Sequence, residues 1–161
     1  MVSTAPVTIQ DMTLDDVDGV QEVERASFPV PWPANAFRHE LTQNKNARYI
    51  VARDGDRIVA YAGLWLMVDE AHITTFAVHP DARRRRIGER LLQRLFEIVT
   101  EDRTLKRVFV ACGGNDAEAG EFMERIRPLM PHTEFHLAQI GPVVGVHAGP
   151  NVLGVALLGR E

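Results

Sequence analysis

The chain has 161 residues, a formal net charge of −4 at pH 7 and an ordinary share of apolar and charged side chains for a globular protein. This length predicts one domain, and the acidic balance argues against direct binding to nucleic acid. No apolar run reaches the roughly 20 residues that cross a membrane, no signal peptide opens the chain, and the single Cys112 fits a reducing compartment. We therefore expect a cytoplasmic protein, and we assign no metal site.

The first part of the chain predicts alternating helices and strands. A short strand at Val7–Ile9 precedes a helix that Thr13 and Asp16 begin as a capping-box pair, and Phe28-Pro29 ends this helix. A proline-rich segment, a second short helix and two strands follow, and Asp54-Gly55 predicts an antiparallel hairpin between these strands. The first helix is expected to bury Val17, Val20, Val23 and Ala26, and the second to bury Ala36, Phe37 and Leu41. The two strands of the hairpin are expected at Tyr49–Ala52 and Ile58–Met67.

The stretch from Glu70 to Leu95 reads as a strand, a basic turn and an amphipathic helix. Pro80-Asp81 ends the strand, four arginines run from Arg83 to Arg86, and apolar residues then recur at helical spacing from Ile87. Where a strand leads through a turn into the start of a helix, free backbone N–H groups and the positive end of the helix dipole point to the same place. This stretch therefore predicts an anion site, and a solvated basic turn is the alternative interpretation.

The remaining chain predicts a second set of elements. A strand at Val108–Ala111 leads through Gly113-Gly114-Asn115 into a helix, which ends at Pro128. A strand at Phe135–Ile140 follows, and after a glycine-rich segment Val152–Leu158 predicts a closing strand. The helix is expected to bury Ala119, Phe122, Met123 and Ile126.

Four segments carry a resemblance to a known family: Met12–Asp16, Ser27–Trp32, Tyr61–Trp65 and Ile73–Pro80, the last followed by the arginine-rich turn. From Val7 to about Thr100 the chain resembles the GNAT acetyltransferases, and most of all the RimI family of bacterial ribosomal-protein N-terminal alanine acetyltransferases. The resemblance implies an α/β (α+β) fold with a GNAT-like mixed central sheet, helices on both faces and a single domain over residues 1–161.

The resemblance also implies acetyl-CoA as co-substrate. The family's basic, glycine-containing loop presents N–H groups to the pyrophosphate, and the backbone of the preceding strand pairs with the pantetheine arm. The family often has glycine where this chain has Arg86, and a positive φ there would hinder the closest backbone approach. The cofactor-binding residues implied in this way are Phe76, Ala77, Val78, Arg83, Arg84, Arg85, Arg86, Ile87, Gly88, Glu89 and Asn115.

Acetyl transfer to an amine needs a base for the ammonium proton and an acid for the leaving thiolate. In the family a glutamate and a tyrosine serve, and alignment on Asn115 places Val110 and Phe122 at their positions, where neither can transfer a proton. Glu70 and His72 remain as substitute catalytic candidates. The alternatives are an exposed charge at a strand end and a hydrogen-bonded structural imidazole.

The tail carries a second resemblance. Val108–Asn115 and Ile140–Pro150 resemble the C-terminal end of the DegV family, so that residues 104–161 form a DegV-like segment that completes the sheet. Those proteins bind fatty acids, and the histidine of the closing motif, which lies near the bound carboxylate, corresponds by position to His147. A structural role in a glycine-rich turn is the alternative for His147. The chain thus reads as a join near residues 100–106.

Three hypotheses of function follow from these patterns. The first is an N-acetyltransferase acting on a protein N-terminal amine, by resemblance the alanine of a small-subunit ribosomal protein, with no membrane or nucleic-acid partner. The second is a CoA- or acyl-CoA-binding protein without turnover. The third is a fatty-acid-binding fragment of DegV type centred on His147, or a misjoined chain without activity.

Overall fold

The computed structural model describes residues 6–101, 105–112, 116–140 and 153–159. The chain divides into two compact units. The first unit comprises Met1–Leu66 and Thr74–Glu97, and the second comprises Met67–Ile73 and Ile98–Glu161. The long strand β4 (Glu70–Val78) therefore contributes its start to the second unit and its end to the first.

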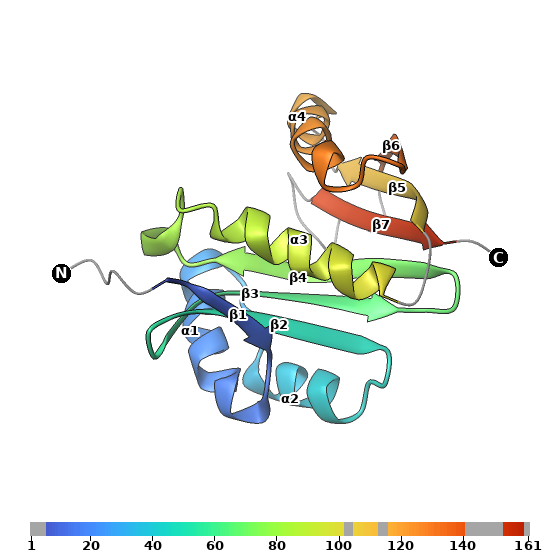
Figure 1. Ribbon diagram of the computed structural model, residues 1–161. Coiled ribbons are helices and arrows are strands. Elements are labelled where there is room, and N and C mark those ends of the chain that lie inside the picture. The colour runs from blue at the N-terminus through green and yellow to red at the C-terminus, as the bar shows by residue number, and fades with distance from the viewer. Residues whose placement is uncertain (1–5, 102–104, 113–115, 141–152, 160–161) are drawn as a thin grey trace. The chain divides into compact units, whose positions relative to one another are not determined.

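The first unit is an antiparallel sheet with helices (Figure 1). Strand β1 pairs with β2, β2 pairs with β3, and β4 follows β3 in the hydrogen-bonded order. In Figure 1, α1 and α2 lie on one side of these strands and α3 lies on the other. The elements are β1 (Thr8–Asp11), α1 (Val17–Ser27), α2 (Ala34–Thr42), β2 (Ala47–Asp54), β3 (Arg57–Leu66) and α3 (Ile87–Thr100).

The predicted start of the first helix is confirmed, with one difference in its first turn. Asp16 Oδ2 accepts hydrogen bonds from the Thr13 N–H at 2.8 Å and from the Thr13 hydroxyl at 3.1 Å. The turn Leu14–Asp16 is a 3₁₀ helix, and the α-helix begins only at Val17. Asp16 is buried and also pairs with Arg53 of β2, so the cap ties the helix start to the sheet. At the other end Phe28 is extended, as the Phe28-Pro29 stop predicted.

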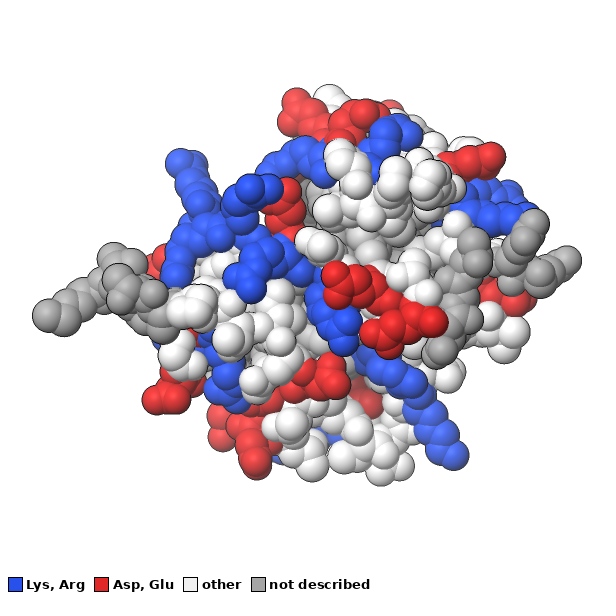
Figure 2. Space-filling model, in the orientation of Figure 1, with Lys and Arg blue, Asp and Glu red and all other residues white. Residues whose placement is uncertain are grey.

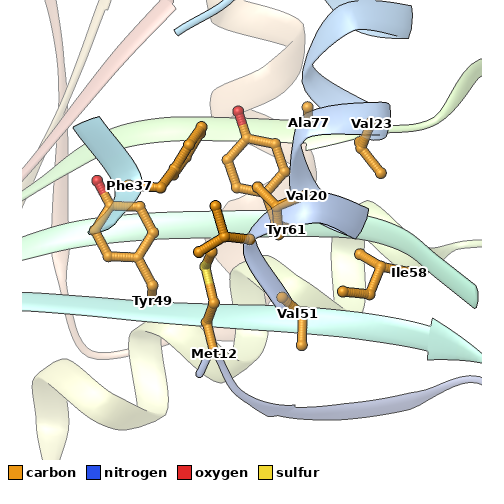
Figure 3. Close-up of a cluster of buried hydrophobic side chains, with 10 residues drawn as sticks. Met12, Val20, Val23, Phe37, Tyr49, Val51, Ile58, Tyr61 and Ala77 are labelled. Carbon is orange, nitrogen blue, oxygen red and sulfur yellow. The ribbon is translucent and has the colours of Figure 1, made fainter. Parts of the chain in front are cut away.

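The core of the first unit is an aromatic cluster on the face that α1 and α2 cover. Phe37 stands edge-on to both Tyr49 and Tyr61, with ring centroids 6.2 and 5.5 Å away, and Figure 3 shows it between them. Gly63 makes this arrangement possible, because a Cβ at Gly63 would lie 2.3 Å from a Tyr49 ring carbon. The Tyr49 ring therefore lies across β3 at the point where that strand has no side chain.

The second unit contains the remaining strands and one helix. Strand β7 (Leu153–Gly159) is antiparallel both to β5 (Leu105–Cys112) and to β4, which it meets at Glu70–His72. Strand β6 (Glu134–Gln139) is parallel to β5. The helix α4 covers Asp116–Ile126.

The predicted end of this last helix is wrong by one short turn. Residues Arg127–Leu129 form a 3₁₀ helix instead of continuing the α-helix to Pro128. Pro128 has no N–H for an α-helical hydrogen bond, and it disfavours the α conformation at Arg127, so the helix ends at Ile126.

The expected fold class is confirmed. Seven strands follow the hydrogen-bonded order β1-β2-β3-β4-β7-β5-β6, which mixes antiparallel pairs with the parallel pair of β5 and β6. Strand β7 lies between β4 and β5 in this order, so these two do not pair directly. Within the described residues, no helix combines the length and the apolar character that a membrane crossing requires.

Candidate functional site

The predicted strand, turn and helix are all present, and the end of the strand, the turn and most of the helix belong to the first unit. Strand β4 ends at Val78, and the N–H of His79 donates to the carbonyl of Val59 on β3 at 2.8 Å. A 3₁₀ turn at Pro80–Ala82 leads to the four arginines, and α3 begins at Ile87. The N–H of Arg90 donates to the Arg86 carbonyl at 3.1 Å. The N–H groups before Arg90 therefore belong to the first turn of α3, where no intrahelical acceptor is available.

Two arginines of the turn have a left-handed backbone. Arg84 has φ 62° and Arg86 has φ 59°, whereas Arg85 between them has a negative φ. A non-glycine residue in this conformation costs roughly 1–2 kcal/mol, and such strain is typical of functional sites. Successive residues of opposite backbone hand can point their N–H groups to one side and form a concave anion-binding nest, which is what the sequence predicts for this turn. Arg86 therefore has the positive φ that hinders the closest backbone approach at that residue, and we expect cofactor binding at this turn to be retained but weakened relative to glycine there.

The arginine side chains have different partners. Arg83 Nε donates to the carbonyl of Val78 at 3.1 Å, and Arg85 pairs with Asp54 of β2 at 2.7 Å. Arg86 forms a fork with Glu89, with bonds of 2.8 and 3.0 Å, and these bonds raise its pKa further. The guanidinium of Arg84 has no hydrogen-bond or ion-pair partner among the described residues. Figure 2 shows basic side chains gathered over the turn that precedes α3.

The three β4 residues assigned to the cofactor face opposite ways. Ala77 is buried in the core cluster with residues of α1. Phe76 and Val78 instead face α3, because a Cβ added at Gly88 would lie 3.5 Å from a side-chain carbon of each. Strand β7 pairs with β4 only as far as His72. Among the described strands, none pairs with the edge from Phe76 to Val78 that lies opposite β3.

Glu70 and His72 are brought together at the start of β4, in the second unit. His72 Nε2 lies 2.5 Å from Glu70 Oε2, and the two side chains are 42% and 45% exposed. Their backbones pair with Leu158 and Ala156 of β7. The pair is therefore a half-exposed carboxylate–imidazole couple on a paired strand, which is compatible both with proton transfer and with a structural ion pair.

Sequence reasoning missed a buried polar chain in the first unit. Tyr61 of β3 donates its hydroxyl proton to Glu24 of α1, and Thr75 Oγ1 of β4 lies 2.9 Å from the same hydroxyl. Glu24 is 2% exposed and also accepts the N–H of Trp32 at 2.8 Å. The carbonyl of Trp32 in turn accepts from Gln21 at 2.6 Å. One signal was available, because Glu24 occupies the i+7 position from Val17 on the apolar stripe of α1.

A neighbouring group of polar side chains surrounds Tyr49. Burial, more than any charge, raises the pKa of Tyr49 to about 12. The Tyr49 hydroxyl lies beside the Thr74 hydroxyl, which acts to lower this pKa, and beside the Glu40 carboxylate, which acts to raise it. Glu40 of α2 accepts from the Trp65 indole at 2.6 Å and from Asn44 at 3.1 Å. Besides Asp16, the helices α1 and α2 thus bring two buried carboxylates, Glu24 and Glu40, to the sheet face that carries the two buried phenols.

Comparison with known proteins decides the family. A protein-family model described as "Acetyltransferase (GNAT) family" matches residues 17–127, which is more than half of the chain. The chain belongs to the acetyltransferase (GNAT) family. A Bacillus subtilis protein named "Putative ribosomal protein bS18-alanine N-acetyltransferase" is 37% identical over 93 residues, which cover 58% of this chain. The chain spans 62% of the length of that relative.

Solved structures of low identity share the GNAT fold. The ribosomal-protein-S18-alanine N-acetyltransferase of Escherichia coli matches with a TM-score of 0.68 over 96% of this chain and 94% of that one, at 18% identity. The PaiA N-acetyltransferase of Thermoplasma acidophilum in complex with coenzyme A also gives 0.68, over 97% of this chain and 100% of that one, at 11% identity.

The DegV resemblance has partial support in sequence. Protein DegV of Bacillus subtilis is 29% identical over 73 residues, which cover 44% of this GNAT chain and 26% of DegV. His147 and Asn115 lie outside the described residues. Of the two positions assigned to the family's acid and base, Val110 is buried in β5 and Phe122 is half-buried in α4.

Proposed function

We propose that this GNAT chain is an acetyl-CoA-dependent N-acetyltransferase that acts on a protein N-terminal amine. The observation that carries the proposal is the turn with left-handed Arg84 and Arg86 at the start of α3. A pyrophosphate is the group that such a nest and helix N-terminus would hold. The strain of two non-glycine residues would persist because that conformation is used.

The arm of the cofactor would extend from the turn along β4. The edge of Phe76–Val78 opposite β3 would pair with the pantetheine amides as an added strand pairs with a sheet. Arg84 would add a cation beside the phosphates, and Arg83 and Arg85 would keep their bonds to Val78 and Asp54. Ile87, Gly88 and Glu89 would contribute N–H groups of the first helical turn.

The reaction would be a direct attack of the neutral amine on the thioester carbonyl. Backbone N–H groups of β4 would stabilise the developing oxyanion. The amine must first lose its ammonium proton, and the couple of Glu70 and His72 is one candidate to accept it. Since the side chains of Val110 and Phe122 have no ionisable group, this chain needs another residue to accept that proton.

The acceptor in this proposal is the N-terminal alanine of a small-subunit ribosomal protein. The name of the Bacillus subtilis relative and that of the structural neighbour of Escherichia coli both refer to the alanine of ribosomal protein S18, which supports this acceptor class. The cytoplasmic location expected from the lone Cys112 belongs to the same proposal.

Binding of CoA or acyl-CoA without turnover is the second candidate. It is favoured by one observation, the apolar Val110 and Phe122 at the positions assigned to the family's base and acid. Incubation with acetyl-CoA and an alanine-start peptide, followed by mass spectrometry, separates the two. We expect a mass increase of one acetyl group on that peptide and none on the same peptide with a blocked N-terminus. Cofactor binding without any acetylated peptide would select the second candidate.

A further inference from the structure

The buried polar chain of the first unit connects β4 to a carboxylate. Thr75 lies on β4 immediately before Phe76, its Oγ1 is 2.9 Å from the Tyr61 hydroxyl, and that hydroxyl donates to Oε2 of Glu24. The three groups come from β4, β3 and α1 of one compact unit. Thr75 is half-buried, whereas Tyr61 and Glu24 are 0% and 2% exposed.

The hydrogen bonds that join Thr75, Tyr61 and Glu24 all run in one direction. A phenol carries a single proton, and Tyr61 donates that proton to Glu24. The Tyr61 oxygen can therefore only accept from Thr75, and the Thr75 hydroxyl must be the donor at their 2.9 Å contact. The Thr75 oxygen is left with lone pairs for a further N–H donor. Burial, together with the bond to Glu24, raises the pKa of Tyr61 far above its usual value, so this phenol stays protonated.

Glu24 is held in place by neutral donors. Its Oε1 accepts the N–H of Trp32 at 2.8 Å, and within the described structure no arginine, lysine or histidine pairs with it. The other titratable group that interacts with both Glu24 and Tyr61 is Tyr49 from β2, and Glu40 from α2 interacts with Tyr49. Glu24 is therefore the ionisable end of this hydrogen-bonded series, and the half-buried Thr75 on β4 is its other end.

We propose that Thr75, Tyr61 and Glu24 form a relay that removes the proton of the acceptor ammonium. This inference rests on the proposed function, which places the thioester arm beside Phe76, the residue next to Thr75. Thr75 would touch the amine, and Tyr61 and Glu24 would act through it. The relay supplies the proton acceptor that Val110 cannot be.

The proton balance of the step is complete. The ammonium N–H bond breaks as its proton passes to Thr75 Oγ1, the Thr75 proton passes to the Tyr61 oxygen, and the Tyr61 proton passes to Glu24 Oε2. The neutral amine then attacks the thioester carbonyl, and the C–S bond breaks. The CoA thiolate takes up the second nitrogen proton, and Glu24 later returns its proton through the same chain to water.

The pH dependence of Glu24→Gln tests the relay. Glutamine preserves the shape of the side chain and an acceptor for Trp32, but it cannot take the proton. We expect kcat/KM for an alanine-start peptide to fall about 10²-fold at pH 6.5. The loss should shrink to a few-fold above pH 9, because an α-amino group with a pKa of roughly 8 is then already neutral. A purely structural defect would lower the rate equally at every pH.

Glu40→Gln is the matched control, since Glu40 is also a buried carboxylate that neutral donors hold, and it lies outside the relay. Its pH profile should equal that of the wild type. If Glu24→Gln folds poorly, Thr75→Val should show the same pH-dependent loss, and Thr75→Ser, which keeps the hydroxyl, should restore the rate.

Any one of four results would overturn the relay. A Glu24→Gln deficit that is equal at pH 6.5 and pH 9.5, or no deficit at all, contradicts it while the proposed function stands. Equal activity of Thr75→Val and Thr75→Ser has the same meaning. A wild-type protein that binds acetyl-CoA but acetylates no peptide at any pH contradicts the proposed function, and the relay with it.

Discussion

The arginine turn and the buried polar chain of the first unit accommodate charge in different ways. The turn is exposed, carries four cations in sequence, and presents its main chain at left-handed Arg84 and Arg86. The buried chain holds the carboxylate of Glu24 between two neutral donors, the main-chain N–H of Trp32 and the hydroxyl of Tyr61. A change in the turn should therefore alter ligand binding with little effect on folding. A change in the buried chain should alter the stability of the fold as well as the chemistry.

The largest effect on stability is expected at Gly63, where the Tyr49 ring crosses β3. Gly63→Ala places a Cβ 2.3 Å from a ring carbon whose position Phe37 also restricts. We expect the free energy of unfolding in urea to fall by about 3 kcal/mol. The control is Gly120→Ala on α4, where a Cβ meets nothing within 4 Å. That variant should be neutral or slightly more stable, and equal losses in the two variants would contradict the packing described.

Removal of one hydroxyl from the buried chain should have the next largest effect. Tyr61→Phe keeps the ring against Phe37 but leaves Glu24 and Thr75 without their shared partner. A buried polar group without its hydrogen bond costs about 2 kcal/mol, which urea unfolding would measure. Arg85→Ala is the comparison from the turn. Its ion pair with Asp54 is partly exposed, and we expect a loss below about 1 kcal/mol.

The left-handed arginine predicts an effect of the opposite sign. Arg84→Gly relieves the backbone strain at φ 62° and should raise the free energy of unfolding by about 0.5–1 kcal/mol. Arg85→Gly, one residue away with a negative φ, has no such strain to lose and should be destabilising. If both glycine variants shift stability in the same direction, the turn does not store strain at Arg84.

The smallest effect is spectroscopic and concerns the two phenols. The chain has only two tyrosines, so tyrosinate absorbance reports Tyr49 and Tyr61 alone. Burial raises the pKa of Tyr49 to about 12 and that of Tyr61 still further. The stability linked to Tyr49 is complete below pH 10, its unfolded value, and falls as the pH rises towards 12. A tyrosinate midpoint near pH 10 in the folded protein would contradict the burial of these phenols.

The sequence predicted most elements of the fold because their signals are local. The hairpin at Asp54-Gly55, the cap at Thr13 and the periodicity from Ile87 each depend on a few neighbouring residues. The end of α4 was misjudged because Pro128 still fits a 3₁₀ turn. The place of β7 between β4 and β5 depends on long-range pairing, which no local pattern reveals.

The candidate site divides in the same way. The basic turn was predictable because its arginines are adjacent in sequence. The left-handed φ of Arg84 and Arg86 was not predictable, because glycine is the residue that normally indicates this conformation. The relay was missed because Glu24, Tyr61 and Thr75 lie far apart in sequence and meet only through tertiary packing. The roles of Glu70 and His72 stay predictions.

Titration with acetyl-CoA in a calorimeter tests the central claim most directly. We predict saturable binding by the wild type and at least a tenfold weaker affinity for the Arg84→Ala and Arg85→Ala double variant. Glu24→Gln, which lies in the buried chain, should bind acetyl-CoA as the wild type does. No heat of binding from the folded wild type at high protein concentration, or equal affinity of the double variant, would contradict a cofactor site at the arginine turn.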